Sequence, residues 1–280
     1  MKIGFIGMGN MAQALCEGFV QTGVIERENI FAYAPHQDRL RENAGRIGFT
    51  AVDSLHALAA AADMLFVACK PYQIEDVLTD LGEDLRGKAL VSVAAGWTME
   101  KYELALARLS VAENRSEQAA DSDVEPLIDA VRIQTIMPNT PAMVREGVFL
   151  VEAGNSLTEA ERDYLFRLLK PLGLIHELPG HLLAIGSAVT GCSPAFVDLF
   201  IEAYADAAVK YGIPRADAYR LISQAVLGSA KLQLVTGEHP GVLKDKVCSP
   251  AGTTILGVQA LEECGLRAAC MASVDAVMNK

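Results

Sequence analysis

The N-terminal stretch "GFIGMGNMAQA" has the residue types and the spacing that suit phosphate binding. Gly7 permits a tight turn, Gly9 lets the backbone approach a pyrophosphate, and Ala12 keeps a following helix close to its strand. The first N–H groups of that helix would then face the phosphates. Because the stretch follows an apolar strand at residues 2–6 and precedes a helical pattern up to about Thr22, we expect a dinucleotide-binding turn.

A second stretch, residues 244–257 ("KDKVCSPAGTTILG"), carries hydroxyl groups but no histidine and no obvious acid–base pair. Ser249 and the proline after it end one helical pattern, and Thr253 and Thr254 begin the next. One interpretation is a helix cap, since serine and threonine are ordinary caps. The other is a carboxylate pocket, built from the hydroxyls and the free N–H groups of a helix N-terminus. The second interpretation suits a small anionic substrate whose reaction depends on positioning more than on strong acid–base catalysis.

Composition excludes several classes of protein. The formal net charge is -11, so a broad basic surface for nucleic acid is not expected. The N-terminus lacks a secretory pattern, and we expect no apolar run near the roughly 18 residues that span a bilayer. The cysteines form no CxxC pair, so they predict reduced thiols in a cytoplasmic protein and no metal site. They are Cys16, Cys69, Cys192, Cys248, Cys264 and Cys270.

The end of the second predicted strand, residues 29–34, bears on the cofactor. An acid at this end would bind a ribose 2′-hydroxyl and favour NAD. No acid occurs before Asp38, and Arg39 and Arg41 follow it. A missing carboxylate removes repulsion against a 2′-phosphate, so the sequence favours NADP(H) and leaves NAD(H) open. His36 would either contact that phosphate or begin the next helix.

Apolar runs without alternation at residues 63–71 and 89–96 predict further buried parallel strands. Residues 130–141, 147–154 and 173–179 predict three more strands. Because the carboxyl ends of such strands face the ligand crevice, Lys70–Pro71 and Ala94–Gly96 should lie beside the cofactor. Lys70 would be a catalytic group or, more commonly, a solvated strand end. Asn139 also follows a strand, where its amide can orient a ligand.

The order of these elements predicts an α/β fold. An N-terminal Rossmann-type doubly wound sheet should occupy residues 1–178, and an all-helical C-terminal domain should occupy residues 179–280. Long apolar helices, such as residues 193–212 and 214–235, favour a helical subunit interface over a lone bundle. Residues 110–129 hold six acids and one arginine, which predicts an acidic surface insertion.

Motifs distributed along the whole chain outside residues 110–129 resemble the pyrroline-5-carboxylate reductase family. They are "GFIGMGNMAQA", "ACKP", "SVAAG", "MPNTPA", "TGCSPAFV", "IEAYADAAVKYGIPRADAY", "QAVLGSAK" and "TGEHPGVLKDKVCSPAGTTI". The resemblance implies reduction of 1-pyrroline-5-carboxylate to L-proline by NAD(P)H, the last step of proline synthesis. It also implies a helical domain that intertwines in a homodimer, with dimers often assembled into larger rings such as decamers.

The resemblance also assigns site residues, position by position. The implied cofactor-binding residues are Ile6, Gly7, Met8, Gly9, Asn10, Met11, Ala34, Pro35, His36, Ala68, Cys69, Lys70, Pro71, Val93, Ala94, Ala95 and Asn139. The implied substrate-binding residues are Asn139, Ser249, Gly252, Thr253 and Thr254. Thr254 matches the threonine that hydrogen-bonds the ring nitrogen, so it is the implied catalytic residue.

Four positions depart from the family pattern. Thr135 stands where arginine is frequent, Trp97 replaces a small aliphatic residue, and Phe196 replaces a common tyrosine. Ala251 stands where the family has the first glycine of "SPGGTT". If that position needs a positive φ, alanine should cost about 1 kcal/mol.

Two other functions fit parts of the sequence. A β-hydroxyacid dehydrogenase shares the plan of the fold but needs a lysine on a core helix, and the helix at residues 193–212 offers only Lys210, near its end. A non-catalytic dinucleotide-sensing regulator would bind a partner through residues 110–129.

Overall fold

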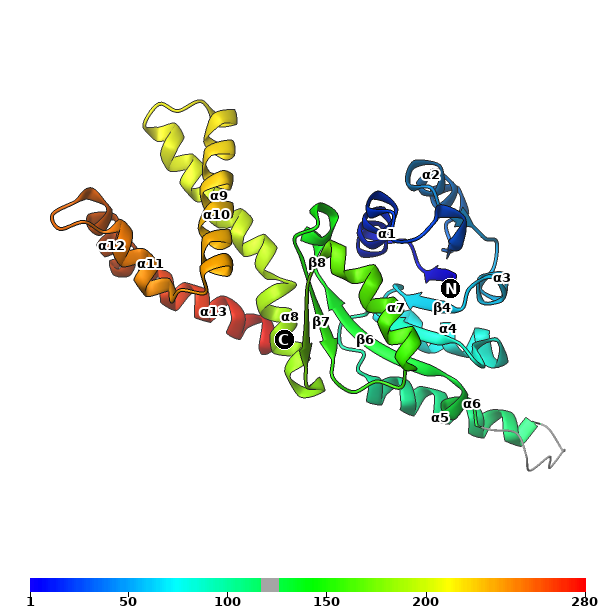
Figure 1. Ribbon diagram of the computed structural model, residues 1–280. Coiled ribbons are helices and arrows are strands. Elements are labelled where there is room, and N and C mark those ends of the chain that lie inside the picture. The colour runs from blue at the N-terminus through cyan, green and yellow to red at the C-terminus, as the bar shows by residue number, and fades with distance from the viewer. Residues whose placement is uncertain (117–125) are drawn as a thin grey trace. The chain divides into compact units, whose positions relative to one another are not determined.

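The protein is described by a computed structural model that covers residues 1–116 and 126–280 (Figure 1). Within these residues one sheet has the strand order β3-β2-β1-β4-β5-β6-β7-β8. All neighbouring strands are parallel except β6 and β7, which are antiparallel. The strands are β1 (Ile3–Ile6), β2 (Ile30–Tyr33), β3 (Thr50–Ala51), β4 (Met64–Val67), β5 (Ala89–Ser92), β6 (Arg132–Pro138), β7 (Gly147–Glu152) and β8 (Gly173–Leu178). The predicted Rossmann-type doubly wound sheet is confirmed; the prediction missed the two-residue β3.

Helices cover both faces of this sheet. They are α1 (Asn10–Thr22), α2 (Gln37–Ile47), α3 (Leu55–Ala61), α4 (Ile74–Leu81), α5 (Met99–Ser116), α6 (Leu127–Ala130), α7 (Glu159–Leu169) and α8 (Leu183–Thr190). Short 3-10 turns are η1 (Arg27–Asn29), η2 (Pro71–Gln73), η3 (Gly82–Leu85), η4 (Thr140–Val144), η5 (Lys170–Leu172) and η6 (Gly180–Leu182). One core packs α1, α2 and α7 against the sheet, and a second core packs α3 to α6 against the opposite face.

The central strands read as continuous apolar runs because they are buried on both faces. Phe5 of β1 points into the first core and stacks on Phe66 of β4, with ring centroids 5.0 Å apart. Its neighbour Ile6 points into the second core. Strand order reverses between β1 and β4, so a crevice for a ligand is expected outside their carboxyl ends.

The predicted acidic insertion at residues 110–129 is described only at its ends. Residues 110–116 continue α5. After the gap, Leu127 and Ala130 of α6 are buried, and the Leu127 N–H donates to Ser110 Oγ (3.1 Å). Both ends therefore belong to the folded unit, while residues 117–125 lie outside the described residues.

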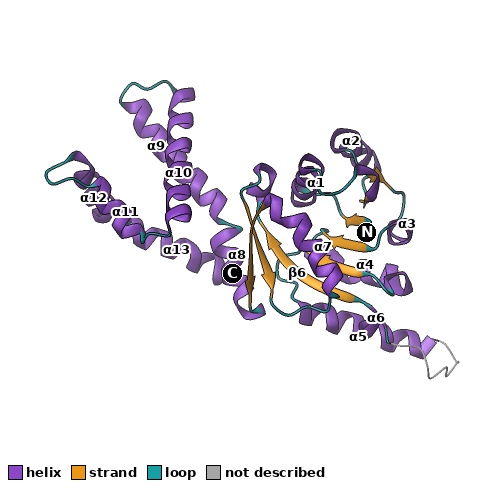
Figure 2. Cartoon of the chain, in the orientation of Figure 1, coloured by secondary structure: helices purple, strands orange, loops and turns teal. Residues whose placement is uncertain are grey.

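The chain divides into two compact units, residues 1–191 and residues 192–280. The second unit is entirely helical, as Figure 2 shows by the absence of strands among its described residues. Its helices are α9 (Ser193–Lys210), α10 (Arg215–Thr236), α11 (Pro240–Val247), α12 (Thr253–Glu263) and α13 (Leu266–Met278). Helix α8 follows the last strand but still packs on the sheet, where Leu183 clusters with Met137 and Leu150.

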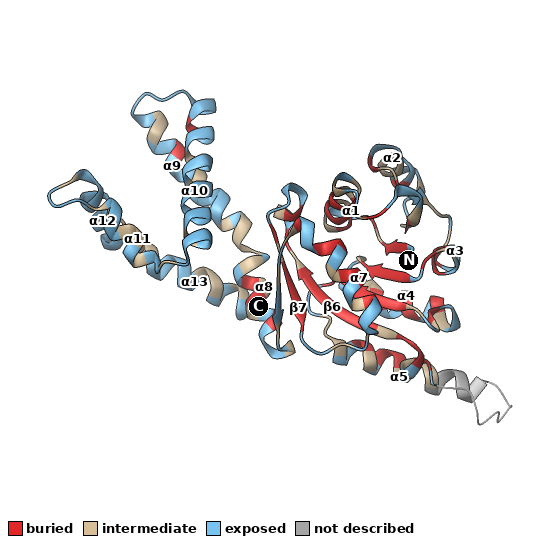
Figure 3. Ribbon diagram, viewed as in Figure 1, coloured by how far each residue is buried: buried red, intermediate tan, exposed pale blue. Residues whose placement is uncertain are grey.

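The second unit has almost no core of its own. In residues 192–280 the buried residues are Ala205 and Ala218 (Figure 3). Large apolar side chains on the same helices are exposed, among them Leu199, Leu234 and Val235 at 67%, 73% and 75%. Because two alanines bury too little apolar surface to hold five helices in place, the helices need another protein surface.

One apolar stretch is longer than the expected limit of roughly 18 residues. By length and composition, Gly180–Lys210 could cross a membrane, with a mean hydropathy of 1.5. The structure divides this stretch, because α8 ends at Thr190 and α9 begins at Ser193. Helix α8 packs on the sheet, and α9 carries charged side chains along its length: Asp198, Glu202, Asp206 and Lys210. Both features favour helices that pack against protein.

Candidate functional site

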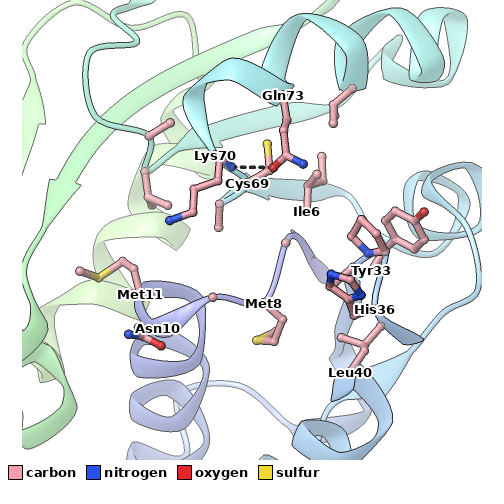
Figure 4. A pocket seen from close by; sticks show the side chains of 18 of the residues that line it. Ile6, Met8, Asn10, Met11, Tyr33, His36, Leu40, Cys69, Lys70 and Gln73 are labelled. Carbon is pink, nitrogen blue, oxygen red and sulfur yellow. Dashed lines mark hydrogen bonds between the residues drawn. The ribbon is translucent and has the colours of Figure 1, made fainter. Parts of the chain in front are cut away.

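A cavity of about 750 Å³ lies at the carboxyl ends of β1, β2, β4 and β5 (Figure 4). Its walls include residues 6–11, 34–36, 68–71 and 93–95. The structure thus brings together every cofactor residue implied by the resemblance except Asn139. This is the switch point of the sheet, where neighbouring connections leave in opposite directions and open a crevice. The volume suits a ligand of cofactor size.

Two glycines give the floor of the cavity its shape. Gly7 has a φ of 94°, and a Cβ there would lie 2.9 Å from the Ala68 carbonyl oxygen. A side chain would therefore push the turn away from the loop after β4. A Cβ at Gly9 would meet no atom within 4 Å, because it would point into open space beside the turn. The residues present therefore leave room for a pyrophosphate against the backbone.

The N-terminus of α1 is available to a phosphate. Gly9 is its N-cap residue, and no side chain caps the helix. The first intrahelical bond of the turn runs from the Gln13 N–H to the Gly9 carbonyl (2.9 Å). The N–H groups before Gln13 therefore have no acceptor within the helix and carry the positive end of its dipole.

The β2 side of the cavity contains residues that no motif predicts or whose role the sequence left open. His36, Arg39, Leu40 and Asn43 all line it. These four follow the i, i+3, i+4, i+7 spacing of one helix face, so the pattern was readable once α2 was placed. Arg41 points elsewhere, since its guanidinium pairs with Asp53 (3.1 Å) and it does not line the cavity.

Other lining residues lacked a motif. They are Tyr33, Leu55, Gln73 and Val77, which enter from the end of β2 and from α3, η2 and α4. These residues reach the cavity because of how the four elements pack, so no local spacing in the sequence predicts them.

The loop after β4 forms the opposite wall. The Lys70 N–H donates to Gln73 Oε1 (3.1 Å), which holds the turn into η2 (Figure 4). Burial raises the pKa of the Cys69 thiol to about 11, so Cys69 lines the cavity as a neutral group at physiological pH. The Lys70 side chain is exposed at the strand end and lines the cavity, so its role as a catalytic group or a solvated strand end stays a prediction.

Asn139 does not line the cavity. Its side-chain oxygen accepts from the Val148 N–H (2.8 Å), and its amide nitrogen donates to the Thr190 carbonyl (3.0 Å). The side chain is only 6% exposed and ties the end of β6 to β7 and to the last turn of α8. Contact of Asn139 with a cofactor or substrate therefore stays a prediction, while its structural bonds are clear.

The predicted substrate loop is a type II turn followed by a helix. The Gly252 N–H donates to the Ser249 carbonyl (3.0 Å), with proline at the second position. Ala251 at the third position has a φ of 56°, so the positive φ considered from the sequence is present. A Cβ at Gly252 would lie 2.5 Å from Ser249 Oγ, which explains why glycine follows.

Helix α12 then begins at Thr253, as predicted. Its N-cap residue is Gly252, and no side chain caps it. The hydroxyls of Thr253 and Thr254 are thus not used as caps, and both residues are exposed in the single chain. The first N–H groups of α12 and these hydroxyls remain available to a carboxylate. These residues belong to the second unit, whereas the cavity belongs to the first.

The departures from the family pattern fall in different places. Thr135 is fully buried on β6, opposite Ser92 of β5, and nothing in the structure explains the replacement of arginine. Phe196 is half-buried on α9. Lys210, the lysine considered for a hydroxyacid dehydrogenase, is the last residue of α9, and its ammonium lies over the Tyr211 ring at 5.7 Å. Among the described residues no cluster of metal-ligating side chains occurs.

Two family models match the chain. Residues 2–96 match the model described as NADP oxidoreductase, coenzyme F420-dependent. Residues 181–280 match the model described as pyrroline-5-carboxylate reductase dimerisation. The first match contains the whole lining of the cavity, and the second contains the type II turn and α12.

Full-length relatives agree with both matches. The chain is 38% identical over 279 residues to the pyrroline-5-carboxylate reductase of Treponema pallidum (strain Nichols), across 100% of this chain and 99% of the relative. It is also 38% identical over 280 residues to the Escherichia coli (strain K12) protein of that name, across 100% and 96% of the two chains.

Solved structures extend the comparison to the fold. The Plasmodium falciparum pyrroline carboxylate reductase with NADP bound superposes with a TM-score of 0.83 at 29% identity, covering 99% of this chain and 95% of that one. A pyrroline-5-carboxylate reductase from Coxiella burnetii gives 0.81 at 27% identity, covering 99% and 96%. The match of residues 2–96 to an NADP oxidoreductase model supports binding of a pyridine nucleotide by this chain. From the glycine turn to the last helix, this chain belongs to the pyrroline-5-carboxylate reductase family.

Proposed function

We propose that this protein reduces 1-pyrroline-5-carboxylate to L-proline with NAD(P)H, the last step of proline biosynthesis. The observation that carries the proposal is the turn at residues 249–252 and the helix that follows it. Helix α12 begins with two adjacent threonines, and no side chain caps its N-terminus. It occurs in a chain that matches reductases of this name over its full length. The same relatives favour this activity over a hydroxyacid dehydrogenase or a non-catalytic regulator.

The residues fit the chemistry of a cyclic imine. The reduced nicotinamide supplies a hydride to the carbon of the protonated C=N bond, which yields a secondary amine. The proton arrives with the substrate, so no buried acid of tuned pKa is needed. Ser249, Gly252 and Thr253 bind the carboxylate and the ring through hydroxyl and N–H groups. Thr254 acts as the catalytic residue by hydrogen-bonding the ring nitrogen.

Alignment is the main source of acceleration in this proposal. Correct placement of two reactants can supply roughly 7–11 kcal/mol of a barrier in favourable cases. Neutral hydroxyls and backbone N–H groups are suited to that role, because they hold an anion without titrating near neutral pH. Asn139 stays a predicted contact of the cofactor and substrate, and its side chain is held by two hydrogen bonds.

NADP(H) is the preferred cofactor in this proposal, with NAD(H) as the weaker one. Arg39 and His36 line the β2 side of the cavity, and its lining contains no carboxylate among the residues that the structure describes. A guanidinium there would pair with a 2′-phosphate, whereas it gains less from a neutral hydroxyl. Arg41 does not line the cavity and pairs with Asp53 at the surface, so it is less suited to this role.

We also propose a cytoplasmic homodimer formed through the helical unit, with decamers as the larger assembly and with no nucleic acid or membrane partner. The exposed apolar side chains of α9 to α13 support the dimer, since they would be costly to leave in water. The match of residues 181–280 to a dimerisation model supports the same arrangement.

Initial rates test the activity directly. Purified protein should oxidise NADPH, and NADH more slowly, when 1-pyrroline-5-carboxylate is added. Thr254→Ala should lower kcat/KM for the imine roughly tenfold, the worth of one hydrogen bond, while dinucleotide affinity stays the same. Thr254→Ser keeps the hydroxyl and is the matched control. Folded protein that binds NADPH but turns over no imine, or that acts on 3-hydroxy acids instead, would refute the proposal.

A further inference from the structure

Trp97, the only tryptophan in the chain, contacts two walls of the dinucleotide cavity. Its indole Nε1–H donates to the carbonyl of Pro71, in the loop after β4 (3.1 Å). Its backbone N–H donates to the carbonyl of Ala94, in the loop after β5 (3.3 Å). Pro71 and Ala94 both line the cavity, whereas Trp97 does not.

The indole is itself anchored to the sheet. Its ring packs on that of Tyr102, with centroids 4.9 Å apart and planes tilted by 57°. Tyr102 is fully buried, and its hydroxyl donates to Ser92 Oγ at the end of β5 (2.9 Å). Burial raises the pKa of Tyr102 well above its usual range, so this donor keeps its proton. Ser92 Oγ also accepts from the Ala94 N–H (3.3 Å), which closes the chain of contacts.

These contacts connect the loops after β4 and β5 beyond the last hydrogen bond between the two strands. The ladder between β4 and β5 ends where the Val93 N–H donates to the Val67 carbonyl (3.1 Å). The two loops then leave the strands, and the indole joins them again at Pro71. Loops fixed before a ligand arrives bind it more tightly, because less ordering entropy is lost on binding.

We propose that Trp97 is a positioning residue that holds these two walls in place for the nicotinamide half of the cofactor. The order of the strands decides which half of the cofactor meets these walls. Strand β2, with His36 and Arg39, lies on one side of β1, and β4 and β5 lie on the other. A phosphate-bearing adenosine ribose belongs on the β2 side of such a sheet. The proposal rests on the proposed function only in taking the ligand to be NAD(P)H.

Two substitutions separate the contacts of the indole. Trp97→Phe keeps an aromatic ring against Tyr102 and removes the hydrogen bond to Pro71. Trp97→Leu removes both. The matched control is Tyr72→Leu, which deletes an aromatic side chain that stands one residue from Pro71 and is 80% exposed.

Calorimetric titration of the full-length variants with NADPH and with 2′,5′-ADP tests the proposal. The second probe carries the adenosine ribose and its 2′-phosphate but no nicotinamide. Trp97→Phe should weaken NADPH binding roughly two- to tenfold, and Trp97→Leu further, while 2′,5′-ADP binding stays as in the wild type. Tyr72→Leu should change neither. In turnover, KM for NADPH should rise while KM for the imine stays constant.

Two results would overturn the proposal. One is wild-type NADPH affinity in both Trp97 variants. The other is an equal loss of affinity for NADPH and 2′,5′-ADP, which would indicate a general loss of structure. The titrations contain no imine, so they decide the role of Trp97 independently of the reaction. A wild-type protein that binds NADPH but reduces no imine would count against the proposed function alone.

Discussion

At the scale of single residues, Ala251 has a side chain at a position whose backbone conformation favours glycine. The third position of a type II turn needs a positive φ and usually carries glycine. Ala251 adopts a φ of 56° there, so its Cβ costs about 1 kcal/mol in the folded state. The turn keeps its shape all the same, because proline precedes Ala251 and the Gly252 N–H closes the turn on Ser249. The turn at residues 249–252 therefore tolerates the departure from the family pattern.

Substitutions at Ala251 should report this strain. Ala251→Gly relieves the folded state but gains entropy in the unfolded state, so the free energy of unfolding should change by less than about 1 kcal/mol. Ala251→Val should lower it by about 1–2 kcal/mol and raise KM for the imine, because a β-branched residue fits a positive φ poorly. Thermal unfolding and steady-state rates measure both effects. A valine variant with wild-type stability and KM would show that the turn is not under constraint.

Asn139 can also be tested by substitution, because both hydrogen bonds of its side chain are known. Asn139→Ala removes both bonds, so we expect the free energy of unfolding to fall by about 2 kcal/mol. Asn139→Asp should cost more at neutral pH, because a buried carboxylate oxygen would face the Thr190 carbonyl oxygen. Chemical denaturation measures these losses. A fall in turnover with unchanged stability would instead indicate direct contact with the reactants.

At the scale of elements, an ion pair fastens α7 to the sheet. Arg132 at the start of β6 donates through Nε and Nη2 to the Glu161 carboxylate of α7, at 2.7–3.0 Å. Thr158, the N-cap residue of α7, donates to the same carboxylate through its N–H and its hydroxyl, both at 2.9 Å. Burial opposes ionisation of Glu161, but these donors outweigh it and lower the pKa of the carboxyl below its usual range.

The sign of this pKa shift predicts acid sensitivity. A carboxyl whose pKa is lower in the folded than in the unfolded protein stabilises the fold above the unfolded value, about 4.3 for glutamate. That contribution is lost as the pH falls through the folded value. Glu161→Gln should therefore lower the free energy of unfolding by about 2 kcal/mol at pH 7 and by less under acid conditions. Denaturation across a pH series measures the difference, and a cost independent of pH would contradict it.

At the scale of the whole molecule, the two units differ in how they are stabilised. The first has an apolar core on each face of its sheet. The second buries only Ala205 and Ala218 within the single chain, although its helices carry many large apolar residues. A domain this poor in buried surface is not stable alone, so its folding free energy must come from association.

One matched pair of substitutions tests this dependence on association. Leu221 of α10 and Leu174 of β8 are 56% and 57% exposed in the single chain, but they belong to the helical and the sheet unit respectively. Leu221→Glu should convert dimers to monomers and lower the melting temperature, because a carboxylate would be buried in the subunit interface. Leu174→Glu should leave the mass in solution unchanged. Light scattering after gel filtration measures both, and a dimer that persists in Leu221→Glu would place the interface elsewhere.

The sequence determined the features that depend on local pattern. Continuous apolar runs identified the long strands, the GxGxxA spacing identified the phosphate turn, and the Ser-Pro and Thr-Thr pairs located the helix break and the start of α12. These features were readable because turn chemistry and helix caps act over a few neighbouring residues. The same locality explains the missed β3, since two residues carry no periodicity.

The tertiary structure decided what depends on residues far apart in the chain. It placed Arg39 in the cavity lining and Arg41 outside it, where Arg41 pairs with Asp53 at the surface. It showed that the Asn139 amide is already bonded, that Trp97 joins two cavity walls, and that α8 belongs with the sheet. Each outcome follows from contacts between elements that are distant in sequence. Local spacing cannot encode such contacts, because they exist only once the strands have set their order and the helices have packed on them.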